Sequence, residues 1–270
     1  MIRISRPLRL YFSAAGILTL AATALRTAAY FTAFDAKLGY FANAPLPTLA
    51  YAVCALVLLL AASFPLVVGK DYTAPAEIPS TLPTMCGAGM AALLMLVTFI
   101  GACTWKDDLQ PPTMLWLLSL LLLPLGAIYF LLRFLADKPP VNVTLLCGYA
   151  AVLALAVVLC STYFDRFVPM NAPRKTDLHV ALLAMMLYLV TELRDLAGRS
   201  APRSRAAFTI LAFSLAFTVG ASGLAAFAAG LYNNVAYLLQ DLLLLGLAAY
   251  VATRALAHAK NEIPHEEETV

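Results

Sequence analysis

Charged side chains are scarce in this chain of 270 residues. Only 12% of the residues are Asp, Glu, Lys or Arg, whereas 62% are hydrophobic. Soluble domains typically carry about 25% charged and about 45–50% apolar residues. A water-soluble core of this size cannot bury such an apolar excess, so the composition argues against a soluble globular protein and predicts contact with a lipid bilayer. The net charge of +3 is too small to indicate nucleic acid as a partner.

Recognisable motifs for cofactor, metal or thiol chemistry are also missing from the sequence. The five cysteines lie in or beside apolar runs without a C-x-x-C spacing, which predicts that they pack as small hydrophobic residues. No Walker, Rossmann or haem motif occurs, and none of the six lysines lies inside an apolar run. The sequence therefore predicts no cofactor and no metal site, and it identifies no catalytic residue.

Eight apolar runs make up most of the chain. Each is near the length of about 20 residues that a helix needs to cross a bilayer, so the sequence predicts an all-α, polytopic integral membrane protein with eight transmembrane helices. The predicted spans cover residues 8–34, 47–69, 85–104, 113–136, 141–163, the stretch between Lys175 and Glu192, 206–229 and 235–254.

The basic residues are distributed unequally between the two sides of the predicted bundle. Twelve of the 18 Lys and Arg residues fall on the side that holds both termini, five fall on the other side, and Arg26 lies inside the first span. The positive-inside rule therefore places both termini in the cytoplasm. This asymmetry and the even number of spans agree with each other.

The loops are too short to hold a soluble domain, so residues 1–260 are predicted to form one eight-helix membrane domain with an acidic cytoplasmic tail at 261–270. Two short patterns hint at a duplication into four-helix halves, 1–138 and 139–260. Residues 98–103 (TFIGAC) are similar to residues 217–222 (FTVGAS), and Tyr129-x-x-x-Arg133 recurs as Tyr250-x-x-x-Arg254. Chance similarity between helices rich in small and aromatic residues is the alternative.

Polar side chains inside the spans are the first candidates for a functional site. Arg26 lies in the first span, and Gln240 and Asp241 lie in the last. Counting at about 1.5 Å per residue places Arg26 and Asp241 at the same depth, about 12 Å from the outer surface. A lone charge at that depth costs a few kcal/mol, so we expect Arg26 and Asp241 to form an ion pair. The alternative is that Arg26 extends to the outer surface while Asp241 meets a hydroxyl group or water.

The outer mouth of the sixth span provides the other candidates. Asp177 and His179 begin this span, but their spacing puts them on different helix faces, which argues against a shared metal ion. Asn171 belongs to the polar loop 163–175, which either caps an outward-facing cavity or is simply solvated. Together with Arg26, Gln240 and Asp241, these three residues form the predicted set of ligand-binding or intramembrane polar residues.

Two patterns resemble those of intramembrane proteases. Residues 220–223 (GASG) resemble the nucleophile motif of rhomboid serine proteases, but the later histidines lie at the opposite end of the last span, so Ser222 is predicted to pack. Glu192-x-Arg194 resembles the carboxylate and arginine of CAAX-type proteases, whose paired glutamates and histidine motifs this chain lacks. Glu192, Arg194 and Asp195 are therefore interpreted as a charge cluster that anchors a helix end.

The segment from Tyr163 to Arg194 resembles small uncharacterised multi-spanning membrane proteins of bacteria, a resemblance that implies a plasma-membrane location and no activity. Our first hypothesis is a non-enzymatic small-molecule carrier or receptor-like protein with a polar site between helices in the outer half. The second is an intramembrane enzyme that uses Ser222 or the region of Asp177 and His179. The third is a scaffold subunit that acts with a partner membrane protein.

Reporter fusions test the predicted topology. Fusions at Lys70 and Arg199 should report a cytoplasmic location, and fusions at Lys106 and Arg174 an external one, because these positions alternate across the eight spans. An external signal from the Arg199 fusion would contradict the assignment.

Overall fold

A computed structural model describes residues 7–36, 38–68, 72, 80–104, 109–135, 140–165, 168–169 and 172–260. Among these residues, eight helices are long and apolar enough to span a membrane, which confirms the predicted all-α polytopic fold. They are α1 (Pro7–Ala33), α2 (Pro45–Val67), α3 (Leu82–Ala102), α5 (Thr113–Leu135), α6 (Val141–Tyr163), α7 (Pro173–Leu196), α8 (Pro202–Ala228) and α9 (Val235–Lys260). Asn171, the tail 261–270 and the fusion positions Lys70 and Lys106 lie outside the described residues.

Helix α7 is longer than predicted at both ends. It begins at Pro173, which occupies the first helical turn, where proline is favoured because its missing N–H is not needed there. It continues past Glu192 to Leu196. Arg174, Lys175 and Glu192, which the sequence placed at or beyond the ends of the span, are therefore helical, and this correction decides which charges meet inside the bundle.

A short hairpin that the sequence did not reveal joins α1 to α2. Strand β1 (Phe34–Asp35) pairs antiparallel with β2 (Tyr40–Phe41), so that Phe34 faces Phe41. Gly39 in the turn has a φ of 73°, a conformation that glycine adopts at no steric cost. The hairpin brings the Phe41 ring to 5.0 Å from the Tyr30 ring, measured between centroids.

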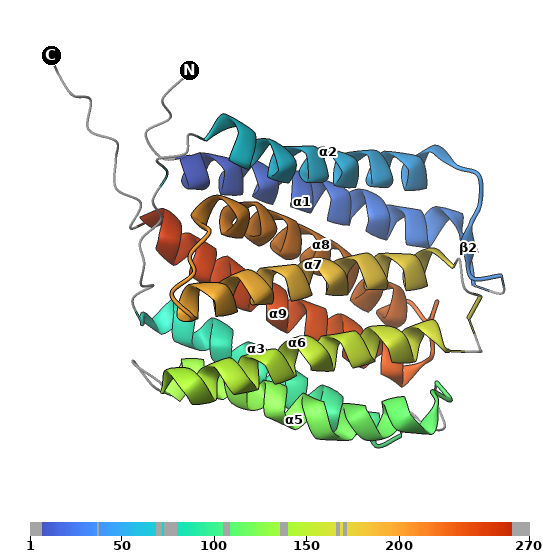
Figure 1. The fold of residues 1–270 in the computed structure, drawn as a ribbon. Helices are drawn as coiled ribbons and strands as arrows, with labels where there is room; N and C mark the ends of the chain where they lie inside the picture. Colours follow the sequence, from blue (N-terminus) through green and yellow to red (C-terminus); the bar gives the residue numbers. More distant parts are fainter. Residues whose placement is uncertain are drawn as a thin grey trace, which may run out of the picture.

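Six of the helices pack in a closed ring, in the order α3, α5, α6, α7, α8, α9. Helices α1 and α2 pack on each other and on α8, outside this ring (Figure 1). The expected ion pair between Arg26 and Asp241 would bring the first and last spans together, but α1 makes its main contacts with α2 and α8 and only minor ones with α9. Helix α1 begins and α9 ends at the same end of the bundle, here called the proximal end; the opposite end is the distal end (Figure 1).

Aromatic side chains join three helices inside the ring. The Phe130 ring lies 5.0 Å from both the Tyr129 and the Tyr250 rings, and the Tyr188 ring lies 6.4 Å from that of Tyr250. All four side chains are buried. They come from α5, α7 and α9, so the ring has a packed core at this level.

Close contact between helices depends on small residues. A Cβ atom added at Gly126 of α5 would lie 2.9 Å from the Cα atom of Ala151 in α6 and 3.0 Å from the sulfur of Met95. At Gly220 of α8 it would lie 2.8 Å from the carbonyl oxygen of Asp241 in α9. Small residues let transmembrane helices approach closely and gain van der Waals contact, which is a main source of their association.

Replacing Gly126 with alanine tests this packing. Because the nearest atom belongs to backbone, α5 and α6 must separate, and we expect a loss of about 1–3 kcal/mol. The matched control is Gly16→Ala in α1, where the added Cβ meets nothing within 4 Å. Thermal unfolding of the purified protein should show a lower midpoint for Gly126→Ala alone; equal midpoints for the two variants would contradict the packing argument.

Candidate functional site

Charged side chains of both signs gather at the distal end of the bundle. The distal charge cluster consists of Arg26 from α1, Arg174 and Asp177 from α7, and Asp241 from α9. Arg174 and Asp177 are three residues apart, so they share one face of α7. Their backbone is helical because α7 begins at Pro173.

The first ion pair of the cluster joins Arg26 and Asp177. The Nη2 group of Arg26 donates to Asp177 Oδ2 and, at 3.2 Å, to the hydroxyl oxygen of Tyr30. The Tyr51 hydroxyl donates to the same Asp177 oxygen at 3.3 Å. The rings of Tyr30, Tyr51 and Phe41 surround the guanidinium carbon, with centroids 5.4, 5.7 and 6.0 Å away. The cation is thus neutralised on one side and held by aromatic faces on the others.

The second ion pair joins Arg174 and Asp241. Arg174 Nη2 donates to Asp241 Oδ2 at 2.6 Å and to the carbonyl oxygen of Tyr237 at 3.1 Å. The rings of Tyr232 and Tyr237 lie 4.7 and 4.9 Å from its guanidinium carbon. The Asp241 carboxylate lies against Gly223 of α8, where any Cβ would collide with it. A glycine at 223 therefore makes room for the buried carboxylate.

The two ion pairs are adjacent rather than separate. Tyr30, beside Arg26, and Tyr232, beside Arg174, have ring centroids 5.9 Å apart. Burial raises the pKa of the Tyr232 phenol well above its usual value, so this hydroxyl stays protonated. One aromatic wall is thus shared by both arginines.

Polar residues of α6, α7 and α9 extend the cluster. The Gln240 amide donates to Thr162 Oγ1 at 3.0 Å, and its carbonyl oxygen is buried without a hydrogen-bond partner in the described part of the chain. Lys175, also buried, donates to the carbonyl oxygens of Asp165 at 2.9 Å and Val168 at 3.2 Å. The Lys175 contacts hold Asp165 and Val168 against the start of α7.

The predicted ion pair between Arg26 and Asp241 is wrong in its partners. Both side chains are buried at the distal end, as the depth count indicated, but Arg26 pairs with Asp177 and Asp241 pairs with Arg174. The depth count considered only charges deep inside the spans. Asp177 was already expected to begin the span, but Arg174 was not, and Pro173, a signal for a helix start, was the feature that could have placed Arg174 on the same helix.

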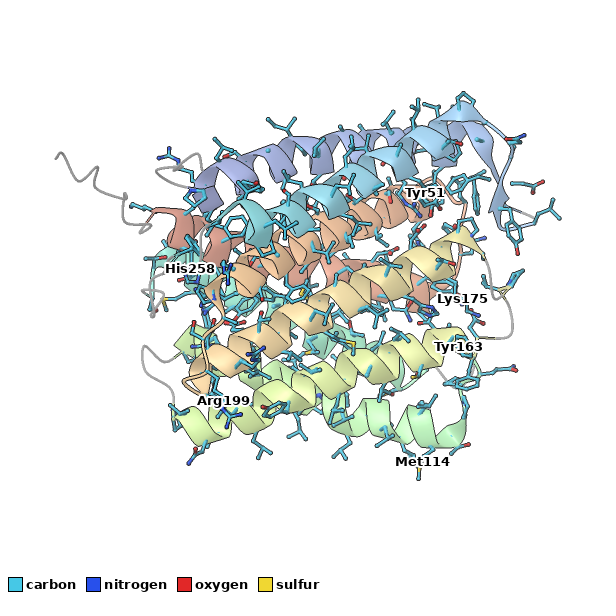
Figure 2. All side chains as sticks on the ribbon, turned by 45° about the horizontal axis from the view of Figure 1, so that its top comes forward. Tyr51, Met114, Tyr163, Lys175, Arg199 and His258 are labelled. Carbon is cyan, nitrogen blue, oxygen red and sulfur yellow. The ribbon has the colours of Figure 1, made fainter. Side chains whose placement is uncertain are left out.

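Asp177 and His179 lie on different faces of α7, as expected from their spacing. Asp177 contacts Arg26 of α1, whereas the half-buried His179 lies 6.2 Å from the Tyr163 ring of α6, measured between centroids. In the described segments, no three His, Cys, Asp or Glu residues come together in a way that would hold a metal ion. Figure 2 shows Tyr51, Tyr163 and Lys175 at the distal end, opposite Arg199 and His258.

A second set of buried charges, the proximal charge cluster, centres on Glu192. Its Oε1 accepts hydrogen bonds from Arg254 Nη2 at 2.7 Å, from Arg133 Nη2 at 3.5 Å and from the Tyr250 hydroxyl at 2.7 Å. Each arginine also lies beside a tyrosine of its own helix, Arg133 beside Tyr129 and Arg254 beside Tyr250. The two Tyr-x-x-x-Arg segments therefore converge on one carboxylate and join α5, α7 and α9.

Glu192, Arg194 and Asp195, interpreted from the sequence as one anchoring charge cluster, have separate surroundings in the structure. Asp195 pairs with Arg205 of α8, and Arg194 is exposed at the helix end, but Glu192 is fully enclosed. Ser222 is buried as predicted, and its hydroxyl donates to the Val219 carbonyl at 3.3 Å. It lies near the distal end of α8, whereas His258 lies at the proximal end of α9.

No protein-family model matches the chain, and comparison with curated proteins and with solved structures finds no significant match. A functional assignment therefore depends on the geometry of the chain itself.

A double-mutant cycle tests the observed pairing. Asp241→Asn should lower stability by about 3–5 kcal/mol, because it leaves the Arg174 guanidinium buried without its anion. Arg174→Met should cost less, since a buried carboxylate can take up a proton while a guanidinium cannot release one. Combining both changes should recover most of the loss, as measured by thermal unfolding midpoints.

The same cycle on Arg26 and Asp241 is the control, because neither is the other's ion-pair partner. Greater recovery in this control than in the Arg174 and Asp241 cycle would favour the pairing predicted from depth alone.

Proposed function

We propose that this protein is a non-enzymatic small-molecule carrier or receptor-like binding protein, and that its ligand binds at the distal charge cluster. The observation that carries this proposal is the ion pair between Arg26 and Asp177, which lies inside the bundle yet beside an accessible rim. The Asp177 side chain is 13% exposed, against 1% for Asp241, and the neighbouring Tyr51 is 41% exposed.

The energetic cost of the cluster supports a functional role. Apolar residues of similar volume in place of a buried ion pair often leave stability unchanged or raise it. Ionisable residues inside a membrane domain are rare and commonly mark the path of a substrate or ion. The distal charge cluster contains two such ion pairs next to each other. The side-chain carbonyl oxygen of Gln240 is also buried, and it has no hydrogen-bond partner in the described residues.

The chemistry of the cluster fits a small polar ligand. Arg26 and Arg174 provide donors, Asp177 and Asp241 provide acceptors, and aromatic rings line both arginines. Sites of this kind combine an apolar wall with a few oriented polar groups. The positive-inside rule places the distal end outside the cell, so the ligand would enter from the outer side.

The proximal charge cluster fits a structural role instead. Glu192 receives donors from α5 and α9 while itself belonging to α7, so it holds three helices at one level. All three donors use Oε1, whereas Oε2 is buried without a hydrogen-bond partner in the described residues. This clamp makes the proximal end a suitable reference for experiments on the distal end.

A thermal-shift screen of the purified full chain tests the proposal. The panel consists of small carboxylates, primary amines, amino acids, neutral sugars and inorganic phosphate. A true ligand at 100 times its Kd should stabilise the protein by about 2.7 kcal/mol, which is a shift of several degrees. The double variant Arg26→Gln with Asp177→Asn removes the first ion pair of the distal charge cluster without leaving a lone charge. It should abolish the ligand-induced shift.

The matched control is Arg205→Gln with Asp195→Asn, the same chemical change at the proximal end. This control variant should show the same ligand-induced thermal shift as the unaltered protein. A ligand whose effect survives the distal variant and is lost in the proximal one would refute the proposed site, and a panel without any Arg26-dependent shift would refute the proposed function.

A further inference from the structure

The guanidinium of Arg26 is only partly used. Both of its hydrogen bonds to Tyr30 and Asp177 come from Nη2, whereas Nε, on the same edge, is buried without a hydrogen-bond partner in the described residues, as is Nε of Arg133, Arg174 and Arg254. Arg26 as a whole is 3% exposed. A carboxylate bound to Nε and Nη2 together forms the stronger, bidentate arrangement. This edge of the Arg26 guanidinium therefore has one free N–H donor, and a carboxylate placed to accept from both Nε and Nη2 would use it.

The position of Arg26 does not depend on Asp177 alone. Three aromatic rings from different elements contact its guanidinium: Tyr30 from α1, Phe41 from β2 and Tyr51 from α2. These cation–π contacts persist when the anion changes. Arg26 is therefore a fixed receptor for an anion, and the carboxylate of Asp177 is the movable partner.

Asp177 is also the more exchangeable of the two aspartates. It lies near the start of α7, after the first turn, its side chain is partly exposed, and it accepts hydrogen bonds from Arg26 and Tyr51. Asp241 is fully buried, bound to Arg174 and pressed against Gly223. An anion that enters from the distal end would thus displace Asp177 and leave the second ion pair intact.

The groups that surround Asp177 decide what happens to it after displacement. Its ionisable or charged neighbours among the described residues include Arg26 of α1, Tyr51 and Cys54 of α2, and Arg174 of α7. Tyr30 of α1 accepts a hydrogen bond from the same Arg26 Nη2 group. Once the ligand occupies Arg26, the remaining cation, Arg174, is already paired with Asp241. A carboxylate in an apolar surrounding without its own cation favours the protonated, neutral form.

We infer that the ligand is a small carboxylate that takes the place of Asp177 on Arg26 and that it binds together with one proton. The ligand carboxylate accepts hydrogen bonds from Nε and Nη2, the bond from Nη2 to Asp177 breaks, and Asp177 takes one proton from water. The net charge of the cluster is the same before and after. This inference rests on the proposed function, since it names the ligand class for that same site.

Calorimetry on the full chain in lipid nanodiscs tests the inference without any variant. The probes are acetate and benzoate, with acetamide and benzamide as uncharged controls of the same shape and empty nanodiscs as the reference. The carboxylates should bind and the amides should not. Titrations at one pH in two buffers of different ionisation enthalpy should show the uptake of about one proton per ligand, and the Kd should fall up to tenfold per unit decrease in pH.

Two variants separate ligand binding from proton uptake. Arg26→Lys keeps the positive charge but loses the planar fork, so benzoate binding should weaken at least tenfold. Asp177→Asn leaves Arg26 free for the ligand, so binding should persist while proton uptake and the pH dependence disappear.

The outcomes distinguish this inference from the proposed function. Carboxylate binding without proton uptake in the unaltered protein overturns the coupling and leaves the proposed function standing. Arg26-dependent binding of an amine or a sugar, with no binding of carboxylates, overturns the ligand class but not the site. Proton uptake that is unchanged in Asp177→Asn assigns the proton to another group and refutes the exchange.

Discussion

The cost of placing charge in an apolar medium shapes this protein more than any other constraint. Each buried cation named above has an anion or a carbonyl oxygen beside it: Arg26 has Asp177, Arg174 has Asp241, and Lys175 has two backbone carbonyls. The helices must therefore stand in a register that brings these groups to equal depth. At Gly223, the absence of a side chain makes room for the buried Asp241 carboxylate in that register.

The fold could be predicted largely from hydropathy and length, because a spanning helix has few alternatives in a bilayer. The ends of α7 and the hairpin after α1 could not be predicted from hydropathy and length. Helix ends lie in polar sequence, where apolar length carries no signal, and only Pro173 marked the true start. The burial of Arg26 and Asp241 was predictable from depth, but their partners were not, since packing between distant helices leaves no trace in local sequence. Arg174 illustrates this: its charge suggested a loop, and its place in a helix gives it an anion.

The recurring Tyr-x-x-x-Arg pattern gained a physical meaning from the structure. In sequence it was a weak sign of duplication, and the division into four-helix halves stays a prediction. In space, Arg133 and Arg254 approach one carboxylate of α7 from two helices, each beside its own tyrosine ring. A guanidinium needs both an acceptor and a weakly polar face when it leaves water, and a tyrosine one helical turn away supplies the second. The pattern therefore describes a local solution to burial, whatever its origin.

The pairing of Arg26 with Asp177 has a consequence for how the chain enters the membrane. The two residues are 151 positions apart, and their helices, α1 and α7, are the two spans of lowest mean hydropathy. During synthesis α1 reaches the bilayer long before its counter-ion exists, so for that interval Arg26 must be hydrated or screened by lipid headgroups. The ion pair of Arg26 can therefore form only after the sixth span has been inserted. Biogenesis of this protein would be sensitive to the insertion machinery at α1 and α7, and far less so at the leucine-rich spans between them.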